Sequence, residues 1–228
     1  MCSGDNTIIM ACSSLRHHVK AAQQRMGTSF EVVELNRALH AKPARMRDKI
    51  IETMAGLPPQ IETVLVGMGF CGGSWNQVQL NHRVVIPKVD DCITLLLHTD
   101  DTRHANLKKP GHFYFRDSDT GAYTLRGMLK RLCEKHGREE GKSIFKSWFK
   151  NYTNADIIDT GAYDCHSPAY LEKARQNADL IHCALGHVSG SNRILEKMVS
   201  GRWDEQFLVL YPNIPVTMEA FQLPPMIW

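Results

Sequence analysis

The sequence predicts an α/β fold with a mostly parallel, Rossmann-like sheet, helices on both faces of the sheet and a helical insertion. Strand-like apolar runs alternate with helix-like stretches along almost the whole chain, which is the pattern of repeated βα units. Several runs, such as "TIIMA" and "RVVIP", are nearly continuous aliphatic segments. Strands that helices cover on both faces have this composition.

The N-terminal part of the chain predicts parallel strands joined by helices. Strands are expected at 7–11, 30–36, 62–69 and 83–87, and helices at 14–26, 44–56 and 90–98. Ser13 and Ser14 are candidate N-caps of the first helix, and Pro43 suits the first turn of the second. Gly27 and Gly56 mark the ends of these two helices.

The C-terminal part continues the alternation after one long helical stretch. A β-like piece is expected at 112–117, a helical insertion at about 124–152 with breaks near Gly137 and Gly141, strands at 155–161, 180–186 and 206–212, and helices at 168–178 and 191–201. No low-complexity linker interrupts the chain. The sequence therefore predicts a single α/β domain over residues 1–228.

The composition excludes several classes of function. The chain is 43% hydrophobic and 22% charged, with a formal net charge of +3, too small to indicate a nucleic-acid-binding protein. No apolar stretch approaches the length that spans a bilayer, and the N-terminus lacks the features of a secretory signal. A cytoplasmic protein that acts on a small molecule, with neither nucleic acid nor membrane as a partner, is expected.

Three of the seven cysteines follow predicted strands directly. Cys12 comes after "TIIMA", Cys71 lies in "GFCGG" after "VLV", and Cys92 ends "KVDDC" after "RVVIP". The carboxyl ends of parallel strands share one edge of a sheet, where α/β proteins bind ligands. Three thiolates with an open fourth position suit a soft metal or an iron–sulfur cluster. We expect their sulfur atoms within roughly 6–7 Å of one another. The alternative is that they are small buried hydrophobes.

The segment "DTGAYDCH" carries more polar groups than a simple connection needs. Asp159, Tyr163 and Asp164 are candidate site residues there, because loops at strand ends often carry function. Asp91, Tyr163 and Asp164 are assigned proton transfer or orientation, while Asp91 has an alternative role as a helix cap. Whether Cys165, His166 and His187 join the site stays open. Cys133 and Cys183 are expected to pack, the first within a helix and the second within a strand.

A dinucleotide fingerprint competes with the metal hypothesis. Gly67, Gly69 and Gly72 form a GxGxxG after a strand, and Asp90 and Asp91 follow at a distance typical of a ribose-binding acid. However, only about ten residues separate the glycines from the next strand, which is short for a crossover helix. We expect no helix to begin at Gly72, and we expect the loop to present Cys71 instead.

The motifs together resemble a family of bacterial and archaeal proteins of unknown function, domain-of-unknown-function family number 1638. The stretches that carry the resemblance are "IIMACSSL", "GFCGG", "RVVIPKVDDCITLLL", "DTGAYD" and "RILEKMVSGRWDEQFLVLYP". They run in order from Ile8 to about Tyr211. The genes of this family in anaerobes often lie beside genes for corrinoid-dependent methyltransferases, so the resemblance implies a setting in anaerobic one-carbon metabolism.

The family pattern maps onto a defined set of residues: Cys12, Cys71, Asp91, Cys92, Gly161, Tyr163 and Asp164. The chain departs from the pattern after Cys71, where it reads "GGSWNQ", and in "GHFYFRDSDTGAYT". The resulting hypothesis is a metal- or iron–sulfur-dependent protein acting on a small molecule in methyl-transfer metabolism. The alternatives are a nucleotide- or dinucleotide-dependent enzyme using the glycine loop, and a non-catalytic accessory protein that binds a corrinoid protein or methyltransferase.

Overall fold

A computed structural model describes residues 6–116 and 124–221. The contacts of the chain divide it into two compact units, one formed by Met1–Leu107 with Ser191–Trp228 and the other by Lys108–Gly190. The helical insertion expected at about 124–152 falls within the second unit. That the whole chain forms one domain stays a prediction. Within the described ranges, no helix combines the length and the apolar character that crossing a bilayer requires.

The first unit is built on a five-stranded sheet with strand order β2-β1-β3-β4-β8. These strands are β1 (Thr7–Cys12), β2 (Glu31–Leu35), β3 (Thr63–Gly67), β4 (Arg83–Pro87) and β8 (Phe207–Leu210). The first four are parallel, and β8 runs antiparallel to β4. The prediction of a mostly parallel α/β sheet is confirmed, and the carboxyl ends of β1 to β4 share one edge.

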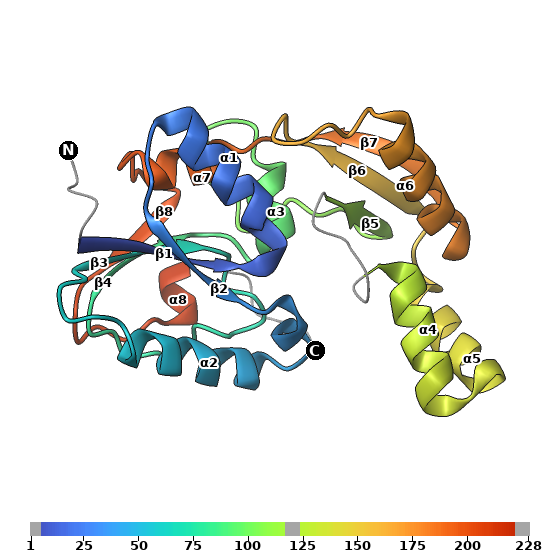
Figure 1. The fold of residues 1–228 in the computed structure, drawn as a ribbon, viewed down its shortest axis with the longest axis horizontal. Helices are drawn as coiled ribbons and strands as arrows, with labels where there is room; N and C mark the ends of the chain where they lie inside the picture. Colours follow the sequence, from blue (N-terminus) through green and yellow to red (C-terminus); the bar gives the residue numbers. More distant parts are fainter. Residues whose placement is uncertain (1–5, 117–123, 222–228) are drawn as a thin grey trace. The chain divides into compact units, whose positions relative to one another are not determined.

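Helices cover both faces of this sheet, with α1 and α7 on one side and α2 and α8 on the other (Figure 1). Their bounds are η2 (Ser13–Leu15), α1 (Arg16–Met26), η3 (Arg37–Ala41), α2 (Pro43–Ala55), α3 (Cys92–Leu97), α7 (Arg193–Val199) and α8 (Met218–Phe221). Met46 and Ile50 of α2 belong to the same buried cluster as Ile8 and Met10 of β1. Alternate residues of β1 therefore face α2, which places Cys12 on that face.

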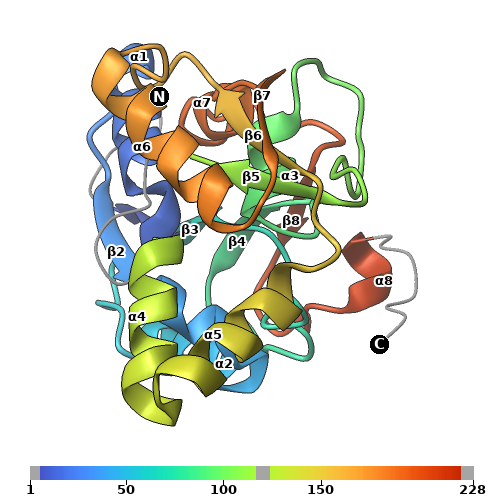
Figure 2. The same cartoon turned by 90° about the vertical axis from the view of Figure 1, so that its right-hand side faces the viewer.

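The second unit contains a separate three-stranded parallel sheet with order β5-β6-β7. Its elements are β5 (His112–Phe115), α4 (Leu125–His136), α5 (Arg138–Phe149), β6 (Asn154–Asp159), α6 (Pro168–Leu180) and β7 (Ala184–Ser189). Helices α4 and α5 form a hairpin, visible in Figure 2. A buried cluster joins Phe145 and Phe149 of α5 to Ile157 of β6 and Ala174 of α6.

Three local expectations are wrong. Ser13 and Ser14 do not cap α1, because they lie inside η2. Cys183 does not lie in a strand, since α6 extends to Leu180 and β7 begins at Ala184. Gly141 does not break the helical stretch but lies within α5, where an added Cβ would stand only 2.5 Å from the backbone nitrogen of Cys133. The absence of a side chain at Gly141 permits the close approach of α4 and α5.

Candidate functional site

The segments after the four parallel strands of the first unit each supply one thiol or imidazole group. Cys12 ends β1, His40 lies in η3 after β2, Cys71 follows β3, and Cys92 begins α3 after β4. The three cysteines are buried, and His40 is half-buried. The predicted trio thus gathers at one edge of one sheet. Sequence reasoning missed His40, although its place after a strand of the same sheet is the signal that selected the cysteines.

Cys12 makes two close polar contacts at this edge. Its Sγ lies 3.2 Å from Nε2 of His40 and 3.1 Å from Oγ of Ser14. Burial raises the pKa of the Cys12 thiol, but the hydrogen bond and charge of His40, with hydrogen bonds at Ser14, outweigh burial and leave the pKa lowered. A thiol whose pKa is lowered in this way is a better metal ligand or nucleophile.

Ser14 links two of the predicted ligands. Its hydroxyl donates to Sγ of Cys92 over 3.7 Å while contacting Sγ of Cys12. Cys92 is the first residue of α3, and Asp91 caps that helix with Oδ1 accepting from the N–H groups of Ile93 and Thr94. The capping alternative for Asp91 is therefore observed, and a catalytic role for it stays a prediction.

Cys71 is held by a strained loop against the Asp90–Cys92 segment. Its backbone has φ +50°, a left-handed conformation that residues other than glycine seldom adopt. The N–H of Cys71 donates to the carbonyl of Asp90 over 2.7 Å, and the N–H of Phe70 donates to the carbonyl of Val89 over 2.9 Å. Burial raises the pKa of the Cys71 thiol well above its ordinary value, and the charges of Cys92, Asp91 and Cys12 add to the rise.

The glycines around Cys71 have packing reasons to be glycine. A Cβ on Gly69 would stand 2.8 Å from backbone atoms of Asp91 and from the carbonyl oxygen of Val89, and one on Gly67 would stand 2.9 Å from Cβ of Ala11. Gly72 has φ +68°. Residues 71–77 form turns and no helix begins at Gly72, as expected. The dinucleotide hypothesis therefore lacks the helix N-terminus that would bind a pyrophosphate.

The second unit gathers another group of donors at the carboxyl end of β6. Ligand atoms of Asp159, Cys165 and His166 all lie within 4.8 Å of one another, and no other such group of three is found in the described part of the chain. Oδ2 of Asp159 is 2.8 Å from Nε2 of His166. The hydrogen bond from His166 lowers the pKa of Asp159, whereas burial, followed by the charge of Asp159, raises the pKa of Cys165 to about 11.

Tyr163 and Asp164 shape the loop that carries this group. The Tyr163 hydroxyl donates to the carbonyl of Ile158 over 2.7 Å, and Oδ1 of Asp164 accepts from the N–H of His166 over 3.2 Å. Both contacts fold the loop back over the end of β6. The role that these contacts give Tyr163 and Asp164 is to position neighbouring residues, and their predicted part in proton transfer is not tested by them.

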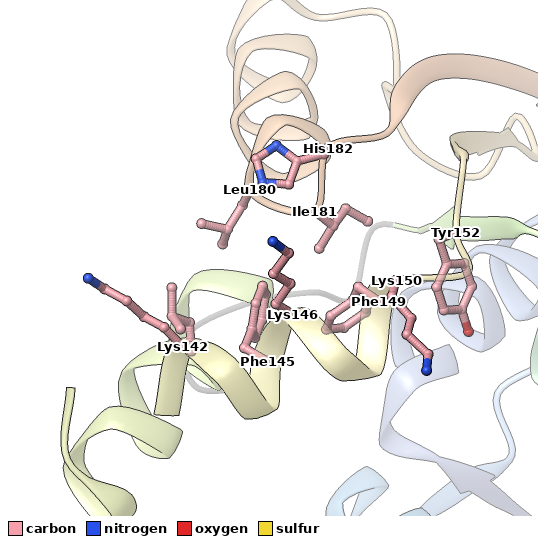
Figure 3. A pocket seen from close by; sticks show the side chains of 10 residues that line it. Lys142, Phe145, Lys146, Phe149, Lys150, Tyr152, Leu180, Ile181 and His182 are labelled. Atoms are coloured by element: carbon pink, nitrogen blue, oxygen red, sulfur yellow. The ribbon is translucent and has the colours of Figure 1, made fainter. Parts of the chain in front are cut away.

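A pocket of about 520 Å³ lies elsewhere in the second unit, between α5 and the end of α6. Phe145, Phe149 and Ile181 line it, and Lys146 projects from α5 toward Ile181 (Figure 3). Lys142, on α5, and Lys150, directly after the helix, flank Lys146. None of the predicted ligands or catalytic residues is among its lining residues.

The fold and the donor sets define an α/β protein with parallel sheets whose carboxyl edges carry thiol and imidazole groups. Residues 34–199 match the profile of a family described as protein of unknown function, DUF1638. The match covers well over half of the chain, which therefore belongs to this family. Comparison with curated proteins and with solved structures gives no significant match.

Proposed function

We propose that the first unit binds a metal ion or an iron–sulfur cluster through Cys12, Cys71 and Cys92, with His40 as an additional ligand. The observation that carries this proposal is the pairing of Cys12 with His40 at 3.2 Å, at the strand edge that also supplies the other two thiols. Sulfur and imidazole nitrogen are the donors that zinc, copper and iron–sulfur clusters take in proteins.

The spacing of these donors favours a cluster over a single ion. Tetrahedral zinc with bonds of about 2.3 Å brings its sulfur ligands to about 3.8 Å from one another. Among the described residues, only the group in the second unit has three donor atoms within 4.8 Å. No set of three donors in the described part of the first unit therefore meets this limit, although Cys12 and His40 are close, and the larger frame of a cluster fits the set with less movement.

The site would serve chemistry on a small molecule in the cytoplasm. An open coordination position lets a metal act as a Lewis acid toward a bound substrate. The chain's own part is to position Cys12 beside Cys92 through Ser14, and to keep Cys71 in place through the Asp90 carbonyl. The setting that we propose, anaerobic methyl-transfer metabolism with a corrinoid protein or a methyltransferase as a partner, rests on the sequence resemblance alone.

The test is metal and acid-labile sulfide analysis of the protein made without oxygen. We expect iron and sulfide in the wild type, and loss of both in Cys71→Ser and Cys92→Ser with the fold retained by circular dichroism. Cys133→Ser is the matched control. It should keep the iron and sulfide content of the wild type, because Cys133 lies on α4 in the second unit. Wild-type protein free of metal, or serine variants with unchanged content, would refute the proposal.

A substrate test follows from the same variants. Addition of a methylated amine should change the visible spectrum of the wild type, since binding at an open position alters the metal's electronic environment. A spectrum that stays constant with methylated amines but changes when a corrinoid protein is added would replace the enzyme hypothesis by the accessory one.

A further inference from the structure

We propose that Asp159, Cys165 and His166 form a binding site for a zinc-type divalent ion in the second unit, independent of the thiolate site in the first. Their donor atoms already lie within 4.8 Å of one another. Zinc bonds of about 2.0–2.3 Å place tetrahedral ligands about 3–4 Å apart, so small side-chain movements suffice to close the site.

The backbone around the three residues prepares this arrangement. Asp159 is the last residue of β6, and its Oδ1 accepts from the N–H of Gly161 over 3.2 Å. Gly161 has φ +67°, which reverses the chain immediately after the strand. One carboxylate oxygen is therefore occupied by the loop, and Oδ2 is left facing Nε2 of His166.

The other two donors return to Asp159 because the loop closes before α6. The N–H of Cys165 donates to the carbonyl of Tyr163 over 3.1 Å, and the N–H of His166 donates to Oδ1 of Asp164. Helix α6 begins two residues after His166, at Pro168. A strand end and the start of a helix thus hold the donors from both sides.

The donor set selects the class of ion. One thiolate, one imidazole and one carboxylate form a mixed set typical of zinc. Magnesium and calcium prefer oxygen alone, and iron–sulfur clusters require several thiolates. Three protein ligands leave a fourth position open, as in catalytic zinc sites.

Solvent can reach this site. His166 is exposed, Asp159 is partly exposed, and Cys165 is buried beneath them. The ring of His187 on β7 stacks on that of His166, with centroids 5.7 Å apart and planes 10° apart. A second imidazole therefore lies beside the proposed ligand His166.

A metal site can be distinguished from a purely structural contact between Asp159 and His166 above the buried Cys165 thiol by the release of a proton. Cys165 must lose its thiol proton to ligate, so each bound Zn²⁺ releases the proton of Cys165 to solvent. No electron transfer occurs, and no other reactant is needed.

The experiment is a titration of reduced, metal-free full-length protein with Co²⁺ and then Zn²⁺, with bound metal, visible absorption and proton release measured. We expect Cys165→Ser and His166→Gln to lose one metal equivalent, or to bind it more weakly by at least the roughly 10–100-fold that losing an outer-shell partner costs. Because His166 is exposed, its replacement leaves the fold intact even if the Cys165 variant unfolds.

Cys183→Ser is the matched control, since Cys183 is the other buried cysteine of the second unit that the structure describes. It should bind as the wild type does. Cys12→Ser separates this site from the one in the first unit, because it must keep the metal equivalent that Cys165→Ser loses. Equal binding by the wild type and His166→Gln, or loss of all metal in Cys12→Ser, would overturn the inference.

Discussion

Sγ of Cys12 and Nε2 of His40 lie 3.2 Å apart, although 28 residues separate them in the chain. The parallel pairing of β1 with β2 brings them together, because Cys12 pairs with Leu35 at the shared end of the two strands. The contact places a thiol with a lowered pKa beside an imidazole inside the first unit. Both the metal proposal and the first prediction depend on this pair.

Replacing His40 by Gln should raise the pKa of Cys12. Burial opposes ionisation of the thiol, and the hydrogen bond and charge of His40 are the largest effects that offset it. The pKa is obtained from the ultraviolet absorbance of the thiolate as a function of pH, taking the difference between each protein and its Cys12→Ser counterpart.

His82→Gln is the control for this measurement. His82 precedes β4 and so lies at the opposite edge of the sheet from Cys12. If the two histidine variants shift the thiolate titration equally, the shift does not arise from contact with His40.

Gly69→Ala should destabilise the first unit by about 1–3 kcal/mol, the usual cost of overpacking a tight site. The added Cβ would meet backbone atoms of Asp91 and Val89 at 2.8 Å, and backbone cannot move aside as a flexible side chain can. Urea denaturation measures the loss.

Gly56→Ala serves as the comparison, because its Cβ would find only an ordinary contact at 3.5 Å and its φ is −89°. We expect no loss of stability there, or a gain of up to about 1 kcal/mol. Similar losses of stability in both variants would show that the close approach of Gly69 to the Val89–Asp91 backbone is not the cause.

Asp101 should make the stability of the protein depend on acid pH. Hydrogen bonds from Lys197 and then Arg193 lower the pKa of Asp101 from 3.8 to about 2. Since the folded-state pKa is the lower one, the stabilisation is fully present above about pH 4 and is lost as the pH falls toward 2. The urea midpoint of Asp101→Asn should therefore change less than that of the wild type between pH 4 and pH 2.

The amine of Lys197 is buried and also contacts Gln206 at 2.6 Å and the carboxylate of Asp204, whereas the Asp101 side chain is exposed. Glu139→Gln is the control, because Glu139 pairs with Lys142 in an exposed position. A pH profile altered as much by Glu139→Gln as by Asp101→Asn would contradict the assignment.

Much of the fold could be predicted because buried parallel strands leave a direct trace in the sequence. The aliphatic runs at β1, β3 and β4 are covered on both faces, and their composition follows from that burial. The end of α6 was misplaced because "LIHCALG" is apolar throughout, so its composition does not separate a helix end from a strand start.

The residues of the candidate site could be proposed from the sequence only where a strand end carried a conspicuous residue. Cys12, Cys71 and Cys92 met that rule, whereas His40 lies in the short helix η3, whose sequence "RALHA" resembles an ordinary helical surface. The bridging role of Ser14 depends on the distance between two strand ends. The left-handed backbone of Cys71 leaves no trace, because a cysteine gives none of the signal that a glycine would.

That backbone leads to the last prediction, which compares Cys71→Gly with Cys71→Ala in metal-free protein. Both variants remove the sulfur, so they differ in the buried Cβ that alanine keeps and in how easily the chain adopts φ +50°. Glycine adopts it freely, whereas a side chain costs roughly 1–2 kcal/mol. Cys71→Gly should therefore be the more stable of the two by about 1 kcal/mol in urea denaturation.

At Cys92 the order should reverse. Cys92 is the first residue of α3, and glycine in a helix is up to about 1 kcal/mol less favourable than alanine. The opposite signs at the two positions separate backbone strain from the loss of a thiol, which is common to all four variants. If alanine is as stable as glycine at position 71, the loop does not strain Cys71, and the argument that the fold holds this thiol in place for a ligand loses its energetic support.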